Sequence, residues 1–184
     1  MSMEVRLVTV EEVRPFVLMD RNAEVDSGTG HGHFNPYSKN VSFDLEETII
    51  KNTNRWNTPI TEPGWTRSFC WFVEGEMAGG LTLAGGNIGT ELHRVFLGMG
   101  LLPQCRGRGG GTTLLNAAIG WAKIQEEIAW IDLGVFGDNP VAERLYRKLG
   151  FKEIGRTMDR FRIDGAKIDN ISMTYYVGDD EEVA

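Results

Sequence analysis

The chain has 184 residues, of which 41% are hydrophobic and 24% are charged, and its formal net charge is −7 at pH 7. This size favours a single domain that spans residues 1–177, followed by an acidic, frayed tail at 178–184. The acidic balance argues against nucleic-acid binding, which requires a basic face. No apolar run approaches the about 20 residues of a membrane helix, no apolar signal core follows the N-terminus, and only two cysteines are present, so we expect a cytoplasmic protein without a membrane partner.

The N-terminal third predicts one strand and two helices. Val5 and Leu7 indicate a short first strand, after which a helix is expected from Glu11. A second helix is expected to begin after Asp44, because a short carboxylate side chain is a favoured N-cap. Between the two helices, residues 26–40 are rich in Gly, Ser, Asn and His, which is typical of a loop.

Apolar runs in the middle of the chain predict three strands. The runs at 67–73 and 77–84 are separated by the sequence Glu-Gly-Glu, which is the pattern of a hairpin. Residues 92–102 indicate a long third strand. Pro103 stops it, because proline has no N–H to donate to a sheet.

The second half of the chain alternates helix and strand. Apolar residues recur at helical spacing over 110–126 and alternate over 128–135, which predicts an amphipathic helix and then a strand. A strand, helix, strand unit implies a locally parallel pair. A final hairpin is expected over 151–162 and 167–177. With antiparallel hairpins at both ends, the order predicts an α+β fold rather than a doubly wound sheet.

A short helix before the final hairpin has clear boundary signals. Asn139 suits the N-cap and Pro140 suits the first helical position. Glu143 and Arg147 are spaced to pair on one face of this helix. Gly150 is expected to end it as a C′ glycine.

A glycine-rich segment between the third strand and the following helix predicts an anion-binding loop. Residues 103–112 have the sequence Pro-Gln-Cys-Arg-Gly-Arg-Gly-Gly-Gly-Thr. The N-terminus of a helix offers unpaired N–H groups and partial positive charge, and glycines let the backbone approach an anion. Arg106 and Arg108 add charge nearby, so the segment suits a pyrophosphate.

Two better-known phosphate loops fit this segment less well. A Walker A loop ends in Gly-Lys-Ser/Thr, and the segment has no lysine. A dinucleotide fingerprint would start at Gly107 and Gly109, but Thr112 stands where the third glycine is needed, although Asp132 follows about 20 residues on. The dinucleotide loop and a plain flexible connector stay open as alternatives.

Two motifs together resemble the GCN5-related N-acetyltransferase (GNAT) family. Arg106, Gly109 and Gly111 match the R-x-x-G-x-G pattern of that family's coenzyme A loop. Residues 139–151, an asparagine followed by a helix ending in Leu-Tyr-Arg-Lys-Leu-Gly-Phe, resemble its second signature, and the spacing between the motifs agrees. The resemblance covers 92–155 and is looser elsewhere.

The resemblance implies a mixed, mostly antiparallel sheet of about seven strands, with a central, splayed parallel pair and about four flanking helices. The strands at 92–102 and 128–135 would start side by side and diverge, with the pantetheine arm of acetyl-CoA in the gap. A primary amine, on a small molecule, a protein or a peptide, would attack the thioester directly in a ternary complex. Members of the family are often dimers, so a homodimer is possible.

The resemblance also implies where acetyl-CoA binds. The expected contacts lie at the strand end, in the glycine loop and at the start of the later helix. They are Leu101, Leu102, Gln104, Arg106, Gly107, Arg108, Gly109, Gly110, Gly111, Thr112, Asn139 and Ala142. Asn139 also suits an N-cap, and one side chain need not do both.

Tyr146 matches the family tyrosine that acts as general acid. A phenol has a reference pKa of about 10 and so stays protonated, able to give its proton to the leaving thiolate. An aromatic residue on the apolar face of a helix more often belongs to the core, so a purely structural role is the alternative.

The general base has no clear candidate in the sequence. Many family members carry a glutamate in the coenzyme A-binding strand, but residues 96–100 contain no carboxylate. Glu91 stands earlier, and His93 would lie about 16–23 Å or more from the thioester at about 3.3 Å per residue. Asp132 and a water relay are left. A low-pKa α-amine would tolerate the missing base best, since deprotonation at pH 7 costs about 1.4 kcal/mol, against about 4 kcal/mol for an alkylamine.

The missing carboxylate favours one rival from another class, a catalytically weak coenzyme A-binding sensor or interaction module. No metal is expected, because His31 and His33 have no cysteine or carboxylate at ligand spacing. The acceptor walls are expected in 26–66 and in the 151–177 hairpin, which contain no motif that identifies the amine.

Overall fold

The structure is a computed structural model that describes residues 2–30 and 32–178. His31 and all of the predicted acidic tail except its first residue, Gly178, lie outside these residues.

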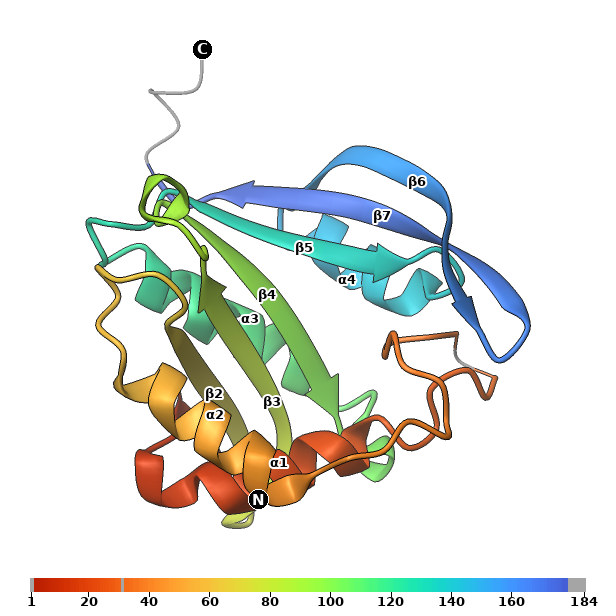
Figure 1. The fold of residues 1–184 in the computed structure, drawn as a ribbon, viewed down its shortest axis with the longest axis horizontal. Coiled ribbons are helices and arrows are strands. Elements are labelled where there is room, and N and C mark those ends of the chain that lie inside the picture. The colour runs from red at the N-terminus through yellow and green to blue at the C-terminus, as the bar shows by residue number, and fades with distance from the viewer. Residues whose placement is uncertain (1, 31, 179–184) are drawn as a thin grey trace.

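A seven-stranded mixed sheet forms the centre of the molecule (Figure 1). Its spatial order is β1-β2-β3-β4-β5-β7-β6, and all neighbours are antiparallel except β4 and β5. This confirms the predicted α+β fold with one parallel pair. The strands are β1 Met3–Leu7, β2 Thr66–Val73, β3 Glu76–Gly85, β4 Arg94–Leu101, β5 Trp130–Phe136, β6 Lys152–Ile163 and β7 Ala166–Tyr176.

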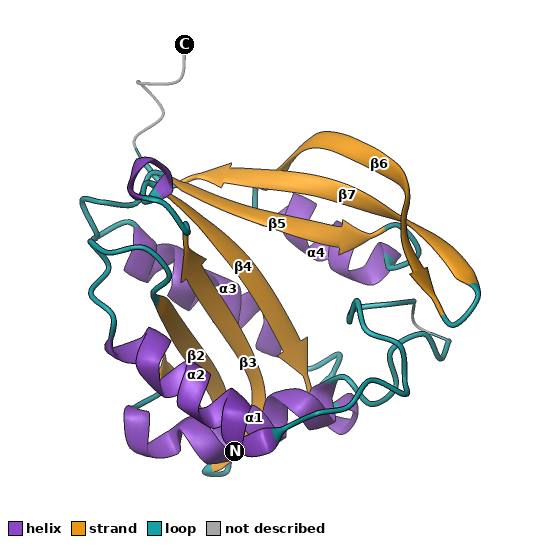
Figure 2. Ribbon diagram, viewed as in Figure 1, coloured by secondary structure: helices purple, strands orange, loops and turns teal. Residues whose placement is uncertain are grey.

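Helices cover both faces of the sheet, with α1 and α2 in front of it and α3 and α4 behind it in the view of Figure 2. Successive side chains of strand β2 therefore pack on opposite faces of the sheet. Trp71 packs with the α3 side of the core, while Cys70 packs with α1 and α2, where Phe16 meets Trp56 edge to face at 5.5 Å between ring centroids. The helices are α1 Val13–Ala23, α2 Leu45–Asn57, α3 Gly110–Ala122 and α4 Pro140–Lys148, with 3-10 turns η1 Val10–Glu12, η2 Gly89–Glu91 and η3 Pro103–Cys105.

Two of the predicted helix starts are confirmed by their caps. The Asp44 carboxylate accepts a hydrogen bond from the backbone N–H of Glu47 at 2.9 Å, and the Asn139 side-chain oxygen accepts one from Ala142 at 3.1 Å. The helix predicted over 110–126 ends earlier, at Ala122. Ile124, which extended the apolar pattern, is 77% exposed, so no burial favours a further turn.

Strands β4 and β5 pair over only three residues each, from Arg94 opposite Trp130 to Phe96 opposite Asp132. Beyond this point they diverge, as Figure 1 shows. Arg94 closes the narrow end by donating two hydrogen bonds to the Asp132 carboxylate, at 2.7 and 2.6 Å, and Thr174 donates a third at 2.6 Å. Asp132 is therefore committed to structural contacts at the closed end, where it is poorly placed to act as a base in the gap.

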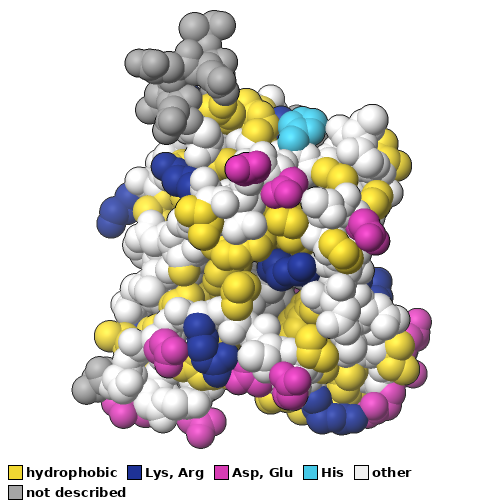
Figure 3. All heavy atoms as spheres, turned by 90° about the vertical axis from the view of Figure 1, so that its left-hand side faces the viewer, with side chains coloured by type: hydrophobic (Ala, Val, Ile, Leu, Met, Phe, Trp, Pro, Cys, Tyr) yellow, Lys and Arg dark blue, Asp and Glu magenta, His cyan; other side chains and the backbone are white. Residues whose placement is uncertain are grey.

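Among the described helices, none has the length and apolar character of a transmembrane segment. On the face drawn in Figure 3, Lys and Arg side chains are interspersed with Asp and Glu, and its described residues form no continuous basic surface.

Candidate active site

Two cavities meet in the gap between β4 and β5. The first, the loop cavity, has a volume of about 610 Å³ and lies between the glycine loop, the end of β4 and the start of α4. The second, the splay cavity, has a volume of about 420 Å³ and runs between β4, β5 and α1 toward Tyr146. The two are continuous, because they share wall residues, namely Phe34, Met99, Gly100, Asn139 and Ala142.

Most of the residues expected to contact acetyl-CoA line the loop cavity. They are Leu101, Arg106, Gly107, Gly109, Gly110, Gly111, Thr112, Asn139 and Ala142. Gln104 and Arg108 are exposed and outside this lining, and Leu102 packs toward the α1–α2 side of the core. The structure thus gathers the two sequence motifs, which lie about one helix and one strand apart in the chain, around one cavity.

The glycine loop presents the N-terminus of α3 to the loop cavity. Gly107 and Gly109 have φ angles of 73° and 86°, a left-handed conformation that favours glycine. Gly109 is the N-cap, and no side chain caps the helix. The N–H groups of the first turn have no acceptor within a helix, so they are available to an anion.

Gly110 and Gly111 line the loop cavity and also allow close packing around the first turn of α3. A Cβ at Gly110 would lie 2.3 Å from Cε3 of Trp71, and a Cβ at Gly111 would lie 3.0 Å from Cδ2 of Leu145. These glycines let the first turn of α3 pack tightly against β2 and α4. The close packing fixes the direction in which the N–H groups point.

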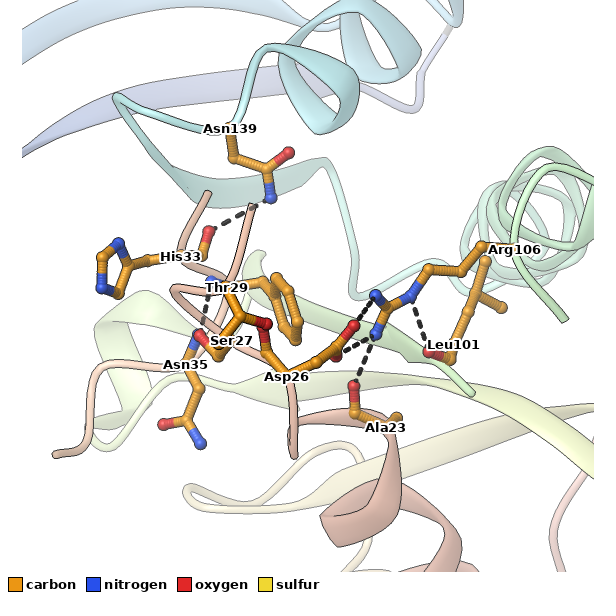
Figure 4. A network of polar contacts seen from close by, with 10 residues as sticks. Ala23, Asp26, Ser27, Thr29, His33, Asn35, Leu101, Arg106 and Asn139 are labelled. Carbon is orange, nitrogen blue, oxygen red and sulfur yellow. Dashed lines mark hydrogen bonds and ion pairs between the residues drawn. The ribbon is translucent and has the colours of Figure 1, made fainter. Parts of the chain in front are cut away.

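The Arg106 side chain braces the site through contacts within the protein (Figure 4). Its guanidinium donates to both Asp26 carboxylate oxygens at 2.7 and 2.9 Å, to the Ala23 carbonyl at 2.9 Å and to the Leu101 carbonyl at 3.1 Å. It also lies over the Phe34 ring, 4.8 Å from the centroid. Arg106 therefore ties the end of α1 to the end of β4, and Asp26 balances its charge.

Asn139 joins the loop after α1 to the start of α4. Its oxygen caps α4, and its nitrogen donates to the His33 carbonyl at 3.1 Å (Figure 4). Nearby, the His33 ring lies 2.6 Å from the Asp138 carboxylate, and a Cβ at Gly32 would meet the Asp138 carbonyl at 2.1 Å. The described residues of the 26–40 loop are thus held against the β5–α4 connection and form one wall of both cavities.

Tyr146 is both a core residue and a wall of the splay cavity. It is 7% exposed, and its ring meets Phe151 edge to face at 5.6 Å between centroids. No described residue forms a hydrogen bond with its hydroxyl. Burial raises the pKa of Tyr146 well above its usual value, so the phenol keeps its proton throughout the physiological pH range.

Two carboxyl groups from α1 line the same cavity, and neither was among the residues singled out from the sequence. Asp20 makes no hydrogen bond or ion pair with any described residue, and burial raises its pKa to about 6. Glu24 accepts a hydrogen bond from the Asn35 amide at 2.7 Å. Burial and the neighbouring Asp20 raise the pKa of Glu24 to about 7, against a smaller opposing effect of Arg21. The sequence did hold a signal: Asp20 stands three or four residues from Phe16, Val17 and Ala23 on the apolar face of α1.

Within residues 2–30 and 32–178, no group of three His, Cys, Asp or Glu side chains is arranged to hold a metal ion. His33 is engaged with Asp138.

Comparison with known proteins assigns the family. The fold combines a sheet opened by a splayed parallel pair with a glycine loop and a helix start that no side chain caps. Residues 36–151 match the model of the acetyltransferase (GNAT) family. The chain therefore belongs to the GNAT acetyltransferase family.

Solved structures share the fold at low sequence identity. A Salmonella typhimurium protein assigned as an acetyltransferase and solved with its cofactor acetyl-CoA superposes with a TM-score of 0.79 at 17% identity, covering 100% of this chain and 98% of that one. A ribosomal-protein-alanine N-acetyltransferase from Brucella melitensis has a TM-score of 0.74 at 22% identity, covering 94% and 99%. A spermidine N-acetyltransferase chimera derived in part from Vibrio cholerae has a TM-score of 0.73 at 20% identity, covering 96% of each chain.

Proposed function

We propose that the protein is an N-acetyltransferase that moves the acetyl group of acetyl-CoA directly to a primary amine in a ternary complex. The observation that carries this proposal is the continuity of the two cavities. One begins at the glycine loop and the other ends at Tyr146, so donor and acceptor can meet in the gap between β4 and β5.

The walls of the loop cavity fit the donor. The uncapped first turn of α3 offers N–H groups and partial positive charge to a pyrophosphate. Met99, Leu101, Val141 and Leu145 give an apolar wall suited to a pantetheine arm. The divergence of β4 leaves part of its edge unpaired, so its backbone can hydrogen-bond to an extended ligand.

Tyr146 is proposed to act on the leaving group. As the amine nitrogen bonds to the acetyl carbon and the carbon–sulfur bond breaks, negative charge develops on sulfur. The Tyr146 hydroxyl, protonated and without a protein partner among the described residues, can donate its proton there.

The test is Tyr146→Phe, assayed by thiol release from acetyl-CoA and by calorimetric binding of coenzyme A. We expect kcat to fall by about 100-fold or more, the usual contribution of a general acid, with little change in coenzyme A affinity. Tyr175→Phe is the matched control, because Tyr175 packs on the same Phe151 at 5.2 Å and lies outside both cavities. An unchanged kcat would remove Tyr146 from the mechanism. Tight coenzyme A binding without thiol release from any amine would favour the non-catalytic sensor or interaction module instead.

A further inference from the structure

We propose that Asp20 is the general base of this reaction, and that with Glu24 it forms an acidic site for an acceptor that arrives as an alkylammonium ion. The inference rests on the proposed function and extends it to the base and to the charge class of the substrate.

The position of Asp20 is the first support. It projects from α1 into the splay cavity, whose wall also contains Tyr146 from α4. Its Oδ1 lies against β4, 3.6 Å from where a Cβ on Gly100 would stand. A Cβ at Gly98 would meet nothing within 4 Å. At the level where the family's strand glutamate was expected, β4 thus leaves open space, and the carboxylate comes from the facing helix.

The unpaired state of Asp20 is the second support. Within the described residues it has no hydrogen-bond or salt-bridge partner, although the cavity wall partly buries it. A carboxylate held in such a place is costly unless something charged or protic occupies the cavity beside it. An ammonium group is both charged and protic. The unpaired Asp20 carboxylate is therefore suited to bind the ammonium form of an amine acceptor.

The charges around Asp20 define the ligand class. Among the residues that line the splay cavity, Asp20, Glu24 and Tyr146 are the titratable ones. Arg21 lies 3.9 Å from Glu24, on the side of a neighbouring cavity of about 560 Å³, and Arg106 is neutralised by Asp26. Two carboxyls therefore face the gap with one cation at its margin. This favours a cationic acceptor over an alcohol or an aromatic amine.

The proton balance follows from these groups. The first ammonium proton passes to the Asp20 carboxylate and then to solvent, which frees the nitrogen lone pair. As the nitrogen–carbon bond forms and the carbon–sulfur bond breaks, Tyr146 gives its proton to sulfur. The second nitrogen proton restores the phenol, so one proton is released for each amide formed. A carboxyl with a pKa raised to about 6 is matched to this role, because it ionises below neutral pH and remains a better base than an ordinary aspartate.

This assignment changes the acceptor expected from the sequence. A low-pKa α-amine was favoured because no base was visible. With Asp20 in the gap, an alkylamine is equally suitable. Glu24 lies between the splay cavity and the neighbouring cavity, so a longer acceptor can extend past it.

The test compares pH profiles of kcat/KM for the wild-type protein and Asp20→Asn. Thiol release from acetyl-CoA is measured with spermidine, an alanine-starting peptide and n-butylamine. Wild-type activity should rise through about pH 6–7 as the acidic pair ionises. Asp20→Asn should lose about 100-fold or more at pH 7, and its remaining rate should rise through the pKa of the free amine instead. Glu24→Gln should raise KM more than it lowers kcat. Glu47→Gln, an exposed carboxyl change on α2, should leave the profile unchanged.

The two proposals fail in different ways. Failure of the proposed function appears as no thiol release by the wild-type protein with any of the three amines. Failure of the Asp20 assignment appears as Asp20→Asn retaining the wild-type rate and pH profile. If the wild-type protein does not turn over, binding of n-butylammonium, followed by NMR at pH 7.5 with n-butanol as the neutral comparison, decides the matter. Loss of ammonium binding in Asp20→Asn supports the acidic site, and equal binding overturns it.

Discussion

Asp20→Asn should make the protein more stable at alkaline pH even as it removes activity. The pKa of Asp20 is raised from 3.8 to about 6 in the folded protein, so folding favours the protonated carboxyl. The stability this group contributes is fully present below pH about 4 and is lost as the pH rises through about 6. The rise in pKa from 3.8 to about 6, at about 1.4 kcal/mol per pKa unit, corresponds to about 3 kcal/mol of stability lost at alkaline pH. This value is an upper limit because the cavity admits water.

The measurement is urea unfolding of wild-type protein and Asp20→Asn at pH 4, 6 and 8, followed by fluorescence of the five tryptophans. The two proteins should match at pH 4, and the asparagine variant should be more stable at pH 8. For a domain of this size, each kcal/mol corresponds to about 2–4 °C in Tm. A gain in stability coupled to a loss of kcat is what a carboxylate kept for function should show.

Glu12→Gln provides a control of opposite sign. Hydrogen bonds from Arg6 and from the Thr9 backbone lower the pKa of Glu12 to about 2, so its contribution is present above pH about 4.5 and is lost as the pH falls through about 2. Glu12→Gln should therefore destabilise the protein at pH 8.

The raised pKa of Asp20 is refuted if Asp20→Asn is less stable than wild type at pH 8, or if its stability differs from wild type equally at pH 4 and pH 8.

Two further predictions concern the glycine loop. Gly110→Ala should destabilise the protein by about 1–3 kcal/mol in thermal melting, because its Cβ would overlap Trp71. As a control in the same helix, the Cβ of Gly120→Ala meets nothing within 4 Å, so this variant should stabilise the protein by up to about 1 kcal/mol. Equal effects of the two variants would contradict the packing role of Gly110. In a double-mutant cycle on coenzyme A affinity, Arg106→Ala and Asp26→Ala should each weaken binding, and the double variant should be no weaker than either alone if Arg106 acts as a brace. Loss of affinity in Arg106→Ala alone would instead indicate a direct phosphate contact.

The features predicted well from the sequence depend on interactions between residues that are close together in the chain. The caps at Asp44 and Asn139 depend on a side chain reaching an N–H group three residues away, so residue type and spacing suffice. The Glu143–Arg147 pair forms for the same reason, with Arg147 Nε 3.0 Å from a Glu143 oxygen. The glycine loop was found because a strand, a run of glycines and a helix follow each other directly in the chain.

The features that the sequence missed depend on contacts between distant segments. Arg106 pairs with Asp26, 80 residues away, and no local pattern distinguishes a guanidinium committed to a carboxylate from one free to bind phosphate. Asp20 becomes a candidate base only because α1 crosses the open end of β4. In the sequence, Asp20 is distinguished only by its spacing from Phe16, Val17 and Ala23 on the apolar face of α1.

The glycines of β4 connect these observations. A Cβ at Gly100 would lie 3.2 Å from the Cβ of Ala23, tighter than ordinary contact, so glycine at this position lets α1 approach the strand closely. The same approach places Asp20, one turn earlier in α1, against Gly100 and within the splay cavity. A glutamate in place of Gly100 would compete for the space that α1 and the Asp20 carboxyl now use. The lack of a carboxylate in the strand and the presence of one on the helix are therefore two consequences of one packing arrangement, and the missing strand glutamate does not by itself indicate that the protein has lost its chemistry.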